Sequence, residues 1–229
     1  MLKNLAILFL LMSANAFAQN LPRNIGFEEG SFNGWNYKVG SIDMQGLLGL
    51  YDSNPVDNRH VLLKQEEIGN ATDRFGGFPK ICPDGGKYSV RLGNELTGHE
   101  AESIYYTFRV PDNAINGYSI TFNYAVVFQN PDHQDFQQPT FTARIYDVVD
   151  DKYVDCPYLK FAASSALPGF KLSPVKAANV NQNSTGPTDV YYKDWSSATI
   201  DLSQHLGKLM RIEFITNDCT QGGHFGYAY

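Results

Sequence analysis

The sequence predicts an all-β fold, an antiparallel β-sandwich of the jelly-roll kind with short helical turns. Apolar and polar residues alternate along many short segments, whereas sustained helical periodicity is nearly absent. Aromatic residues make up 14% of the 229 residues and Gly occurs 20 times, a composition typical of strands joined by tight turns. Turn-forming residues separate about ten expected strands without the regular helical crossovers that a parallel sheet needs.

The first eighteen residues predict a cleaved secretory signal peptide. Lys3 supplies the positive charge, Leu5 to Met12 form an apolar run too short to span a bilayer, and Ala16-Phe17-Ala18 is a small-x-small cleavage site. No Cys follows this site, which disfavours a lipid anchor there. We therefore expect residues 19–229 to form a single secreted or cell-surface domain without membrane insertion.

Three central segments show the clearest strand pattern. In residues 119–129, apolar residues alternate from Ile120 to Phe128, and Asn123 falls on the opposite, polar face. Residues 100–110 and 140–147 alternate in the same way. Their polar faces carry Tyr105, Arg109, Arg144 and Tyr146.

The remaining elements follow from weaker patterns of the same kind. Further strands are expected at residues 60–68, 88–92, 158–162, 198–202 and 209–216. Residues 202–207 favour a short helical turn, and residues 163–189, rich in Ser, Pro, Asn and Gly, predict a long surface excursion. No internal repeat or linker divides the chain.

Charge and motifs restrict the function classes. The net charge of -6, without a cluster of Lys and Arg, disfavours nucleic acid and anionic membranes as partners. The nucleophile elbow, the zinc-protease helix motif, the phosphate loop and the dinucleotide fingerprint are all missing from the sequence. Adjacent acidic pairs such as Glu66-Glu67 point to opposite faces of a strand, although carboxylates on distant strands could still pair. We expect the protein not to be an enzyme.

The cysteine count is odd for an exported chain. Cys82, Cys156 and Cys219 allow at most one disulfide among themselves. The sequence also stops at Tyr229 within an expected strand, so we expect the domain to be truncated at its C-terminal end and followed by further domains of a longer chain. Cys82 and Cys156 are the favoured pair, which leaves Cys219 for a partner further along.

Two histidines and an aspartate invite a metal-site interpretation. His133, Asp218 and His224 carry groups that bind transition metals. Their spacing fits no recognised ligand motif, and a His in a Gly-rich loop more often hydrogen-bonds the backbone. We therefore expect structural histidines here.

The N-terminal segment resembles the opening of jelly-roll carbohydrate-binding modules. Asn24-Ile25-Gly26-Phe27-Glu28-Glu29-Gly30 is followed by Gly34-Trp35, as in that group. The resemblance implies a galactose-binding-like sandwich, a core Phe27, and a structural calcium ion held in part by Glu28. Calcium takes six to eight oxygen ligands, which a carboxylate at this position suits. The alternative is that Glu28 is an ordinary turn carboxylate.

The C-terminal segment resembles an N-terminal domain of large secreted Bacteroidetes surface proteins, of the PKD-repeat and gliding-motility-associated type. The residues that carry this resemblance run from Asp218 through Gly222-Gly223-His224-Phe225-Gly226 to Tyr229, together with Tyr88 to Asn94 and Pro131-Asp132-His133. It covers nearly the whole mature chain but implies no settled activity.

These observations favour a non-catalytic extracellular adhesion or binding module whose partner is a glycan or a surface protein. Sugar recognition needs flat aromatic surfaces and planar polar groups, and five outward residues supply both: Tyr105, Arg109, Asn123, Arg144 and Tyr146. Those residues could equally cover a solvated sheet. The alternative functions are a purely structural cap or spacer of a surface fibre and, less favoured, an extracellular hydrolase.

Overall fold

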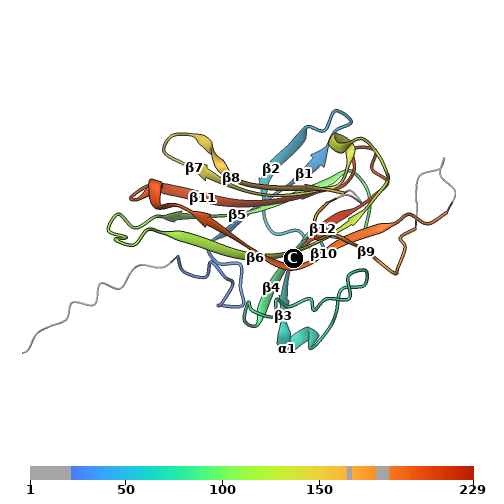
Figure 1. Cartoon of the computed structure of the whole chain (residues 1–229), viewed down its shortest axis with the longest axis horizontal. Coiled ribbons are helices and arrows are strands. Elements are labelled where there is room, and N and C mark those ends of the chain that lie inside the picture. The colour runs from blue at the N-terminus through green and yellow to red at the C-terminus, as the bar shows by residue number, and fades with distance from the viewer. Residues whose placement is uncertain (1–21, 164–166, 179–185) are drawn as a thin grey trace, which may run out of the picture.

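Two six-stranded antiparallel sheets stack face to face in the computed structural model of the chain (Figure 1). The structure describes residues 22–163, 167–178 and 186–229, with the backbone alone at 155–158. The predicted signal peptide lies outside these residues. Sheet A contains, in spatial order, β2 (Leu48–Ser53), β1 (Trp35–Ile42), β5 (Glu100–Arg109), β11 (Leu209–Asn217), β7 (Thr140–Asp147) and β8 (Lys152–Ala162). Sheet B contains β3 (His60–Lys64), β4 (Tyr88–Gly93), β12 (Gly226–Ala228), β6 (Ser119–Gln129), β10 (Val190–Asp201) and β9 (Lys171–Leu172).

The order of the strands is that of a jelly roll. From β4 to β7, each strand lies in the opposite sheet from the strand before it, and the same alternation runs from β10 to β12. Helical structure among the described residues is limited to α1 (Gln65–Ile68) and two short 3-10 turns, Asp135–Gln137 and Ser203–His205. The predicted all-β antiparallel sandwich with short helical turns is confirmed. No helix in the described part of the chain is long and apolar enough to cross a membrane.

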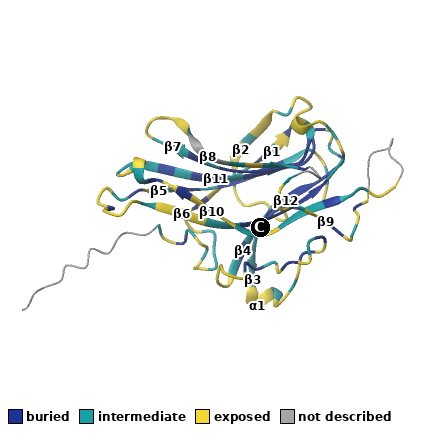
Figure 2. Cartoon of the chain, viewed as in Figure 1, coloured by how far each residue is buried: buried dark blue, intermediate teal, exposed yellow. Residues whose placement is uncertain are grey.

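The main core fills the space between the two sheets, where buried residues concentrate in Figure 2. Sheet A contributes Trp35, Tyr106 and Ile145, and sheet B contributes Leu92 and Val126. Strand residues point alternately to the two faces, so the apolar half of each alternating segment forms this core. The inward residues predicted for β5 and β7 are accordingly buried.

Sheet B is also covered on its outer face. Phe75 and Phe78, from the connection between β3 and β4, pack there against Val127 and Tyr227. The carboxylate of Asp73 anchors this cover, because its Oδ2 accepts bonds from the Tyr227 hydroxyl at 2.8 Å and the Tyr229 hydroxyl at 3.1 Å. Alternate residues of β6 therefore face two different cores, and all its residues from Tyr124 to Gln129 are buried.

Several elements differ from their predicted extents. The strand expected at residues 60–68 ends at Lys64, where α1 begins. β8 and β10 begin earlier than predicted, and β1 and β2 were not predicted as strands. The helical turn expected at residues 202–207 is present as Ser203–His205.

Candidate functional site

A row of aromatic and charged side chains covers the outer face of sheet A. In the strand register, Glu213 lies between Tyr105 and Arg144, and Arg211 lies opposite Tyr146. Their sequence neighbours face the core, so these side chains point away from it. Tyr153 of β8 lies opposite Tyr146 and is 43% exposed. We call this set the platform: Tyr105, Arg144, Tyr146, Tyr153, Arg211 and Glu213.

Arg211 occupies the middle of the platform between two tyrosine rings. Its guanidinium carbon lies 4.6 Å from the ring centroid of Tyr105 and 5.1 Å from that of Tyr146, both within cation–π range. Lys38 of β1 places its ammonium nitrogen 5.3 Å from the Tyr105 centroid. The buried Nε of Arg211 has no hydrogen-bond partner among the described residues. Stacking, rather than ion pairing, therefore holds this guanidinium.

Glu213 fixes the other half of the platform. Its carboxylate is buried and accepts bonds from Arg144 Nε at 2.9 Å, the Tyr153 hydroxyl at 3.2 Å and Ser103 Oγ at 3.0 Å. The Arg144 guanidinium also lies 3.9 Å from the Tyr153 ring centroid. Burial raises the pKa of Tyr153 to about 12, so its hydroxyl remains a donor at neutral pH. These contacts hold the side chains in fixed positions before any ligand arrives.

The structure brings together three of the five predicted ligand-binding residues. Tyr105, Arg144 and Tyr146 all belong to the platform. Arg109 lies at the end of β5, where its Nη1 donates to the Gly207 carbonyl at 2.6 Å. Asn123 was wrongly grouped with them: it belongs to β6 in sheet B, where its side chain accepts a bond from the Ser197 hydroxyl. Alternation within a strand gives the face of that strand, but not the sheet to which it belongs.

Sequence reasoning missed Arg211, Glu213 and Tyr153 as platform residues. The signal was present for the first two, because Arg211 and Glu213 alternate with the core residues Ile212 and Phe214 in a predicted strand. Tyr153 lies in the part of β8 that was not predicted as a strand.

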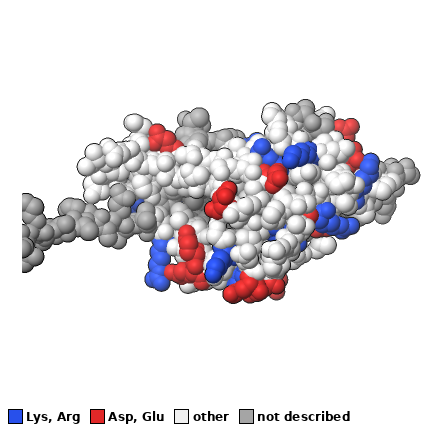
Figure 3. Space-filling model, turned by 60° about the horizontal axis from the view of Figure 1, so that its bottom comes forward, with Lys and Arg blue, Asp and Glu red and all other residues white. Residues whose placement is uncertain are grey.

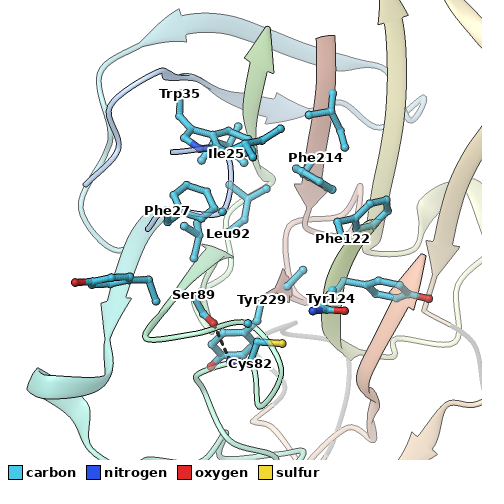
Figure 4. A pocket seen from close by; sticks show the side chains of 18 of the residues that line it. Ile25, Phe27, Trp35, Cys82, Ser89, Leu92, Phe122, Tyr124, Phe214 and Tyr229 are labelled. Atoms are coloured by element: carbon cyan, nitrogen blue, oxygen red, sulfur yellow. Dashed lines mark hydrogen bonds between the residues drawn. The ribbon is translucent and has the colours of Figure 1, made fainter. Parts of the chain in front are cut away.

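A separate cavity of about 330 Å³ opens between β4 and β6 of sheet B. Along part of their length, β12 lies between these two strands. It pairs with Leu92 and Gly93 of β4 on one side and with Val126 to Phe128 of β6 on the other. Beyond Tyr229 the strands have no partner between them in the described structure. Core side chains line the resulting gap, with Trp35, Phe27 and Leu92 on one side and Phe122 and Phe214 on the other (Figure 4).

Glu28 lies at this cavity, and its carboxylate accepts a bond from the Gly26 backbone at 3.1 Å. The side chain is exposed. Among the described residues, the Glu28 carboxylate does not lie close to two other His, Cys, Asp or Glu side chains that could bind the same metal ion. Calcium also takes backbone and amide carbonyl oxygens, which such side-chain groups do not include, so the calcium role of Glu28 stays a prediction.

The histidines do not have the surroundings expected from the sequence. His133 and His224 were expected to hydrogen-bond the backbone, but neither ring does so in the described structure. Instead, the Cys219 sulfur lies 3.3 Å from His224 Nδ1. Asp218 is turned away, since its carboxylate accepts bonds from the backbone amides of Glu100 and Gly226.

The described cysteines carry free thiols. Cys82 and Cys219 are both buried and unpaired. A free Cys82 contradicts the predicted disulfide between Cys82 and Cys156, and the Cys156 side chain lies outside the described residues. Burial raises the pKa of the Cys82 and Cys219 thiols, so without a bound cation neither is expected to act as a nucleophilic thiolate.

Two carboxyl groups have pKa values raised toward neutrality. Burial raises the pKa of Glu102 to about 7 and that of Asp218 to about 8. Such groups often mark active sites, but Glu102 is 1% exposed, Asp218 is 3% exposed, and neither lines the cavity. They lie where a substrate would not reach them.

Opposite charges are mixed over the surface around sheet B. On the face in Figure 3, acidic and basic side chains lie side by side. Ion pairs on and beside the strands of sheet B include Lys64 with Glu67 at 3.1 Å and Arg74 with Glu95 at 3.3 Å. This face therefore lacks the positive field that a polyanionic partner would need.

Comparisons with solved structures give distant similarities in fold. The chain is similar to TmCBM61, solved with β-1,4-galactotriose, at 12% identity and a TM-score of 0.37, covering 90% of this chain and 91% of the other. It is similar to Caldicellulosiruptor saccharolyticus CBM27-1, solved with mannohexaose, at 11% identity and a TM-score of 0.31. This match covers 73% of this chain and 93% of the other. It is also similar to the enzymatically active domain of tailspike protein 4 of bacteriophage CBA120, at 11% identity and a TM-score of 0.36. This match covers 89% of this chain and 20% of the other. No protein-family model and no curated protein matches the chain. Similarities this distant assign no ligand to the chain.

Proposed function

We propose that this chain is a non-catalytic extracellular binding module that holds a glycan on the platform of sheet A. The observation that carries the proposal is the double stacking of Arg211 between Tyr105 and Tyr146, beside the exposed ring of Tyr153. Aromatic rings offer apolar surface to the C–H faces of a sugar, and guanidinium groups offer planar donors to its hydroxyls.

The cavity is a weaker candidate for the glycan. Its lining consists mainly of core aromatic and aliphatic side chains, with few polar groups such as Ser89 and Asn123. A sugar buried there would leave most of its hydroxyls without partners, which costs free energy for each of them. The platform, by contrast, combines apolar rings with charged donors.

Secretion supports an extracellular ligand, and it rests on the predicted signal peptide at residues 1–18. The favoured partners are an extracellular glycan or a surface protein, together with further domains of a longer chain. A structural cap or spacer of a surface fibre is the alternative, and an extracellular hydrolase is less favoured because Glu102 and Asp218 are enclosed.

A glycan array with residues 19–229 tests the proposal, followed by titration calorimetry on any glycan bound. Tyr146→Ala and Tyr153→Ala should each weaken binding by roughly 1–3 kcal/mol, the usual scale for an important interface residue. Tyr51→Ala is the matched control: Tyr51 is 65% exposed on β2, next to Asp52, which contacts Tyr105 on the platform side. Tyr51 thus faces the other way, and its replacement should leave affinity unchanged.

Three results would count against parts of this proposal. An array without any bound glycan would favour the structural cap or spacer. Binding that survives both platform substitutions, with the fold intact by circular dichroism, would move the site away from sheet A. Release of reducing sugar from a bound glycan would favour the hydrolase.

A further inference from the structure

Two loops distant in sequence meet at one end of the sandwich. Residues 130–139 join β6 to β7, and residues 218–225 join β11 to β12. The Thr220 amide donates to the Gln137 carbonyl at 3.1 Å and links the loops. His133 on the first loop and His224 on the second have ring centroids 5.3 Å apart, with their planes at 87°.

Three metal-binding side chains converge at this contact. One ligand atom each from His133, Cys219 and His224 lies within 4.8 Å of the other two, and these residues form the one such group among the described residues. Around a tetrahedral zinc ion, with metal–ligand distances of about 2.0–2.3 Å, neighbouring ligand atoms are roughly 3.5 Å apart. The 3.3 Å between Cys219 Sγ and His224 Nδ1 is already close to that value.

Among the described residues, buried polar side-chain atoms without a protein partner gather at this contact. Buried side-chain atoms without a hydrogen-bond partner number eight in the described structure, and four belong to these two loops: His133 Nδ1, Gln138 Oε1, Thr220 Oγ1 and His224 Nε2. Unpaired buried polar atoms are costly and therefore uncommon. An ion bound here would take one nitrogen of each imidazole, and water molecules around it would be partners for the remaining polar atoms.

The backbone holds the ligands in place. In the second loop, the Cys219 amide donates to the His224 carbonyl at 3.0 Å, and the Gly222 amide donates to the Cys219 carbonyl at 3.0 Å. Gly222 has a φ of 68°, a conformation that favours glycine, which lets this turn close. In the first loop, the side chain of Gln138 donates to the His133 carbonyl at 2.9 Å.

We propose that His133, Cys219 and His224 bind a transition-metal ion, with zinc as the favoured ion. Two imidazole nitrogens and one thiolate suit zinc and other ions of borderline softness, whereas calcium and magnesium require oxygen ligands. Cys219 and His224 are buried and His133 is half-buried, and the three side chains leave a fourth coordination position of a tetrahedral ion for a water molecule. The ion ties the β6–β7 loop to the β11–β12 loop.

Cobalt is the most direct probe, because Co²⁺ replaces zinc at such sites and a thiolate ligand gives it a charge-transfer band in the near ultraviolet. We expect the reduced protein, residues 19–229, to develop this band with one Co²⁺ per chain, and equimolar Zn²⁺ to abolish it. Cys219→Ser should remove the band. Cys82→Ser, which replaces the other described buried thiol, and Cys156→Ser should retain it.

Thermal melting gives a second, independent measurement. Zinc at 100-fold above its Kd should raise the Tm of the wild type by roughly 5–10 °C. His133→Gln should abolish this increase, and its half-buried position makes it the variant best suited to remain folded. No cobalt band in the wild type would overturn the proposal. So would a band that persists in Cys219→Ser, or a zinc-dependent Tm increase that persists in folded His133→Gln.

Discussion

Glu102 is a carboxylate enclosed almost completely by protein. Its Oε2 accepts a bond from Arg59 Nε at 2.8 Å, and its Oε1 accepts one from the Thr216 hydroxyl at 2.9 Å. Burial nevertheless outweighs the attraction of Arg59 and raises the pKa of Glu102 to about 7. Removing a charged group from water costs more here than one ion pair returns.

This raised pKa predicts a loss of stability as the pH rises from acidic to neutral. The folded state binds the Glu102 proton more tightly than the unfolded state, whose pKa is near 4.5. Stability is therefore fully present below the unfolded pKa and decreases as the pH rises toward about 7. Urea denaturation at pH 5 and pH 8 should differ by about 2–3 kcal/mol from this group alone.

Glu102→Gln keeps the size of the side chain but removes its titration. We expect the free energy of unfolding of this variant to change less between pH 5 and pH 8 than that of the wild type. Glu100→Gln is a neighbouring control on the same strand, where the carboxylate is more exposed. Equal pH dependence in the wild type and Glu102→Gln would show that Glu102 is ionised in the folded protein throughout this range.

At the scale of single elements, one aspartate anchors the cover of sheet B to β12. Asp73 is 2% exposed, and its carboxylate accepts bonds from two tyrosine hydroxyls and from the backbone amides of Phe75 and Gly76. Asp73→Ala leaves these buried donors unpaired. We expect it to lower the free energy of unfolding by about 3–5 kcal/mol, whereas Asp73→Asn, which keeps an acceptor oxygen, should cost less.

Equilibrium denaturation of both variants checks this prediction, with Asp84→Ala as the control. Asp84 is an exposed carboxylate outside the buried network. A cost below about 1 kcal/mol for Asp73→Ala would mean that water replaces the carboxylate without loss.

Alternation of apolar and polar residues in the sequence predicted the strands that have one apolar and one polar face. β5 and β7 each have one buried face and one partly exposed face, so alternation identifies them and the outward positions of Tyr105, Arg144 and Tyr146. β2 is mostly exposed and carries no apolar face that a pattern could reveal. In β10, an irregularity between Lys193 and Ser196 interrupts the alternation, and only its second half was predicted.

The candidate sites depend on contacts that no local pattern records. Arg211 reaches the platform because β11 lies between β5 and β7, strands that are far away in the sequence. His133 meets His224 only because two loops converge at one end of the fold. Both arrangements follow from the order of strands in the sheets, which alternation does not determine.

At the scale of the whole molecule, the gap between β4 and β6 has the geometry of a strand site. In the register of β12, the first residue after Tyr229 would lie between Val90 and Tyr124, and the second between Ser89 and Asn123. The first and third added side chains would face the cavity, and the second would face outward. The register therefore predicts that a strand appended after Tyr229 would fill the gap.

A designed extension tests that prediction. Val-Thr-Val appended after Tyr229 should place two valines in the cavity and stabilise the domain by about 2–4 kcal/mol. Thr-Val-Thr has the opposite alternation and should stabilise it much less. Equal melting temperatures for the two extended chains would exclude strand pairing in the gap.

The central position of β12 also sets the order of events during biosynthesis. β4 and β6 are made long before Gly226–Ala228, yet in sheet B they are joined through that strand. A chain that emerges N-terminus first from the ribosome cannot close this sheet until its residues near 226 have been synthesised. Contacts between distant segments also slow folding in general. The domain should therefore complete its fold only after residues near 226 have been made, and chaperones have a long interval in which to bind the incomplete sheet.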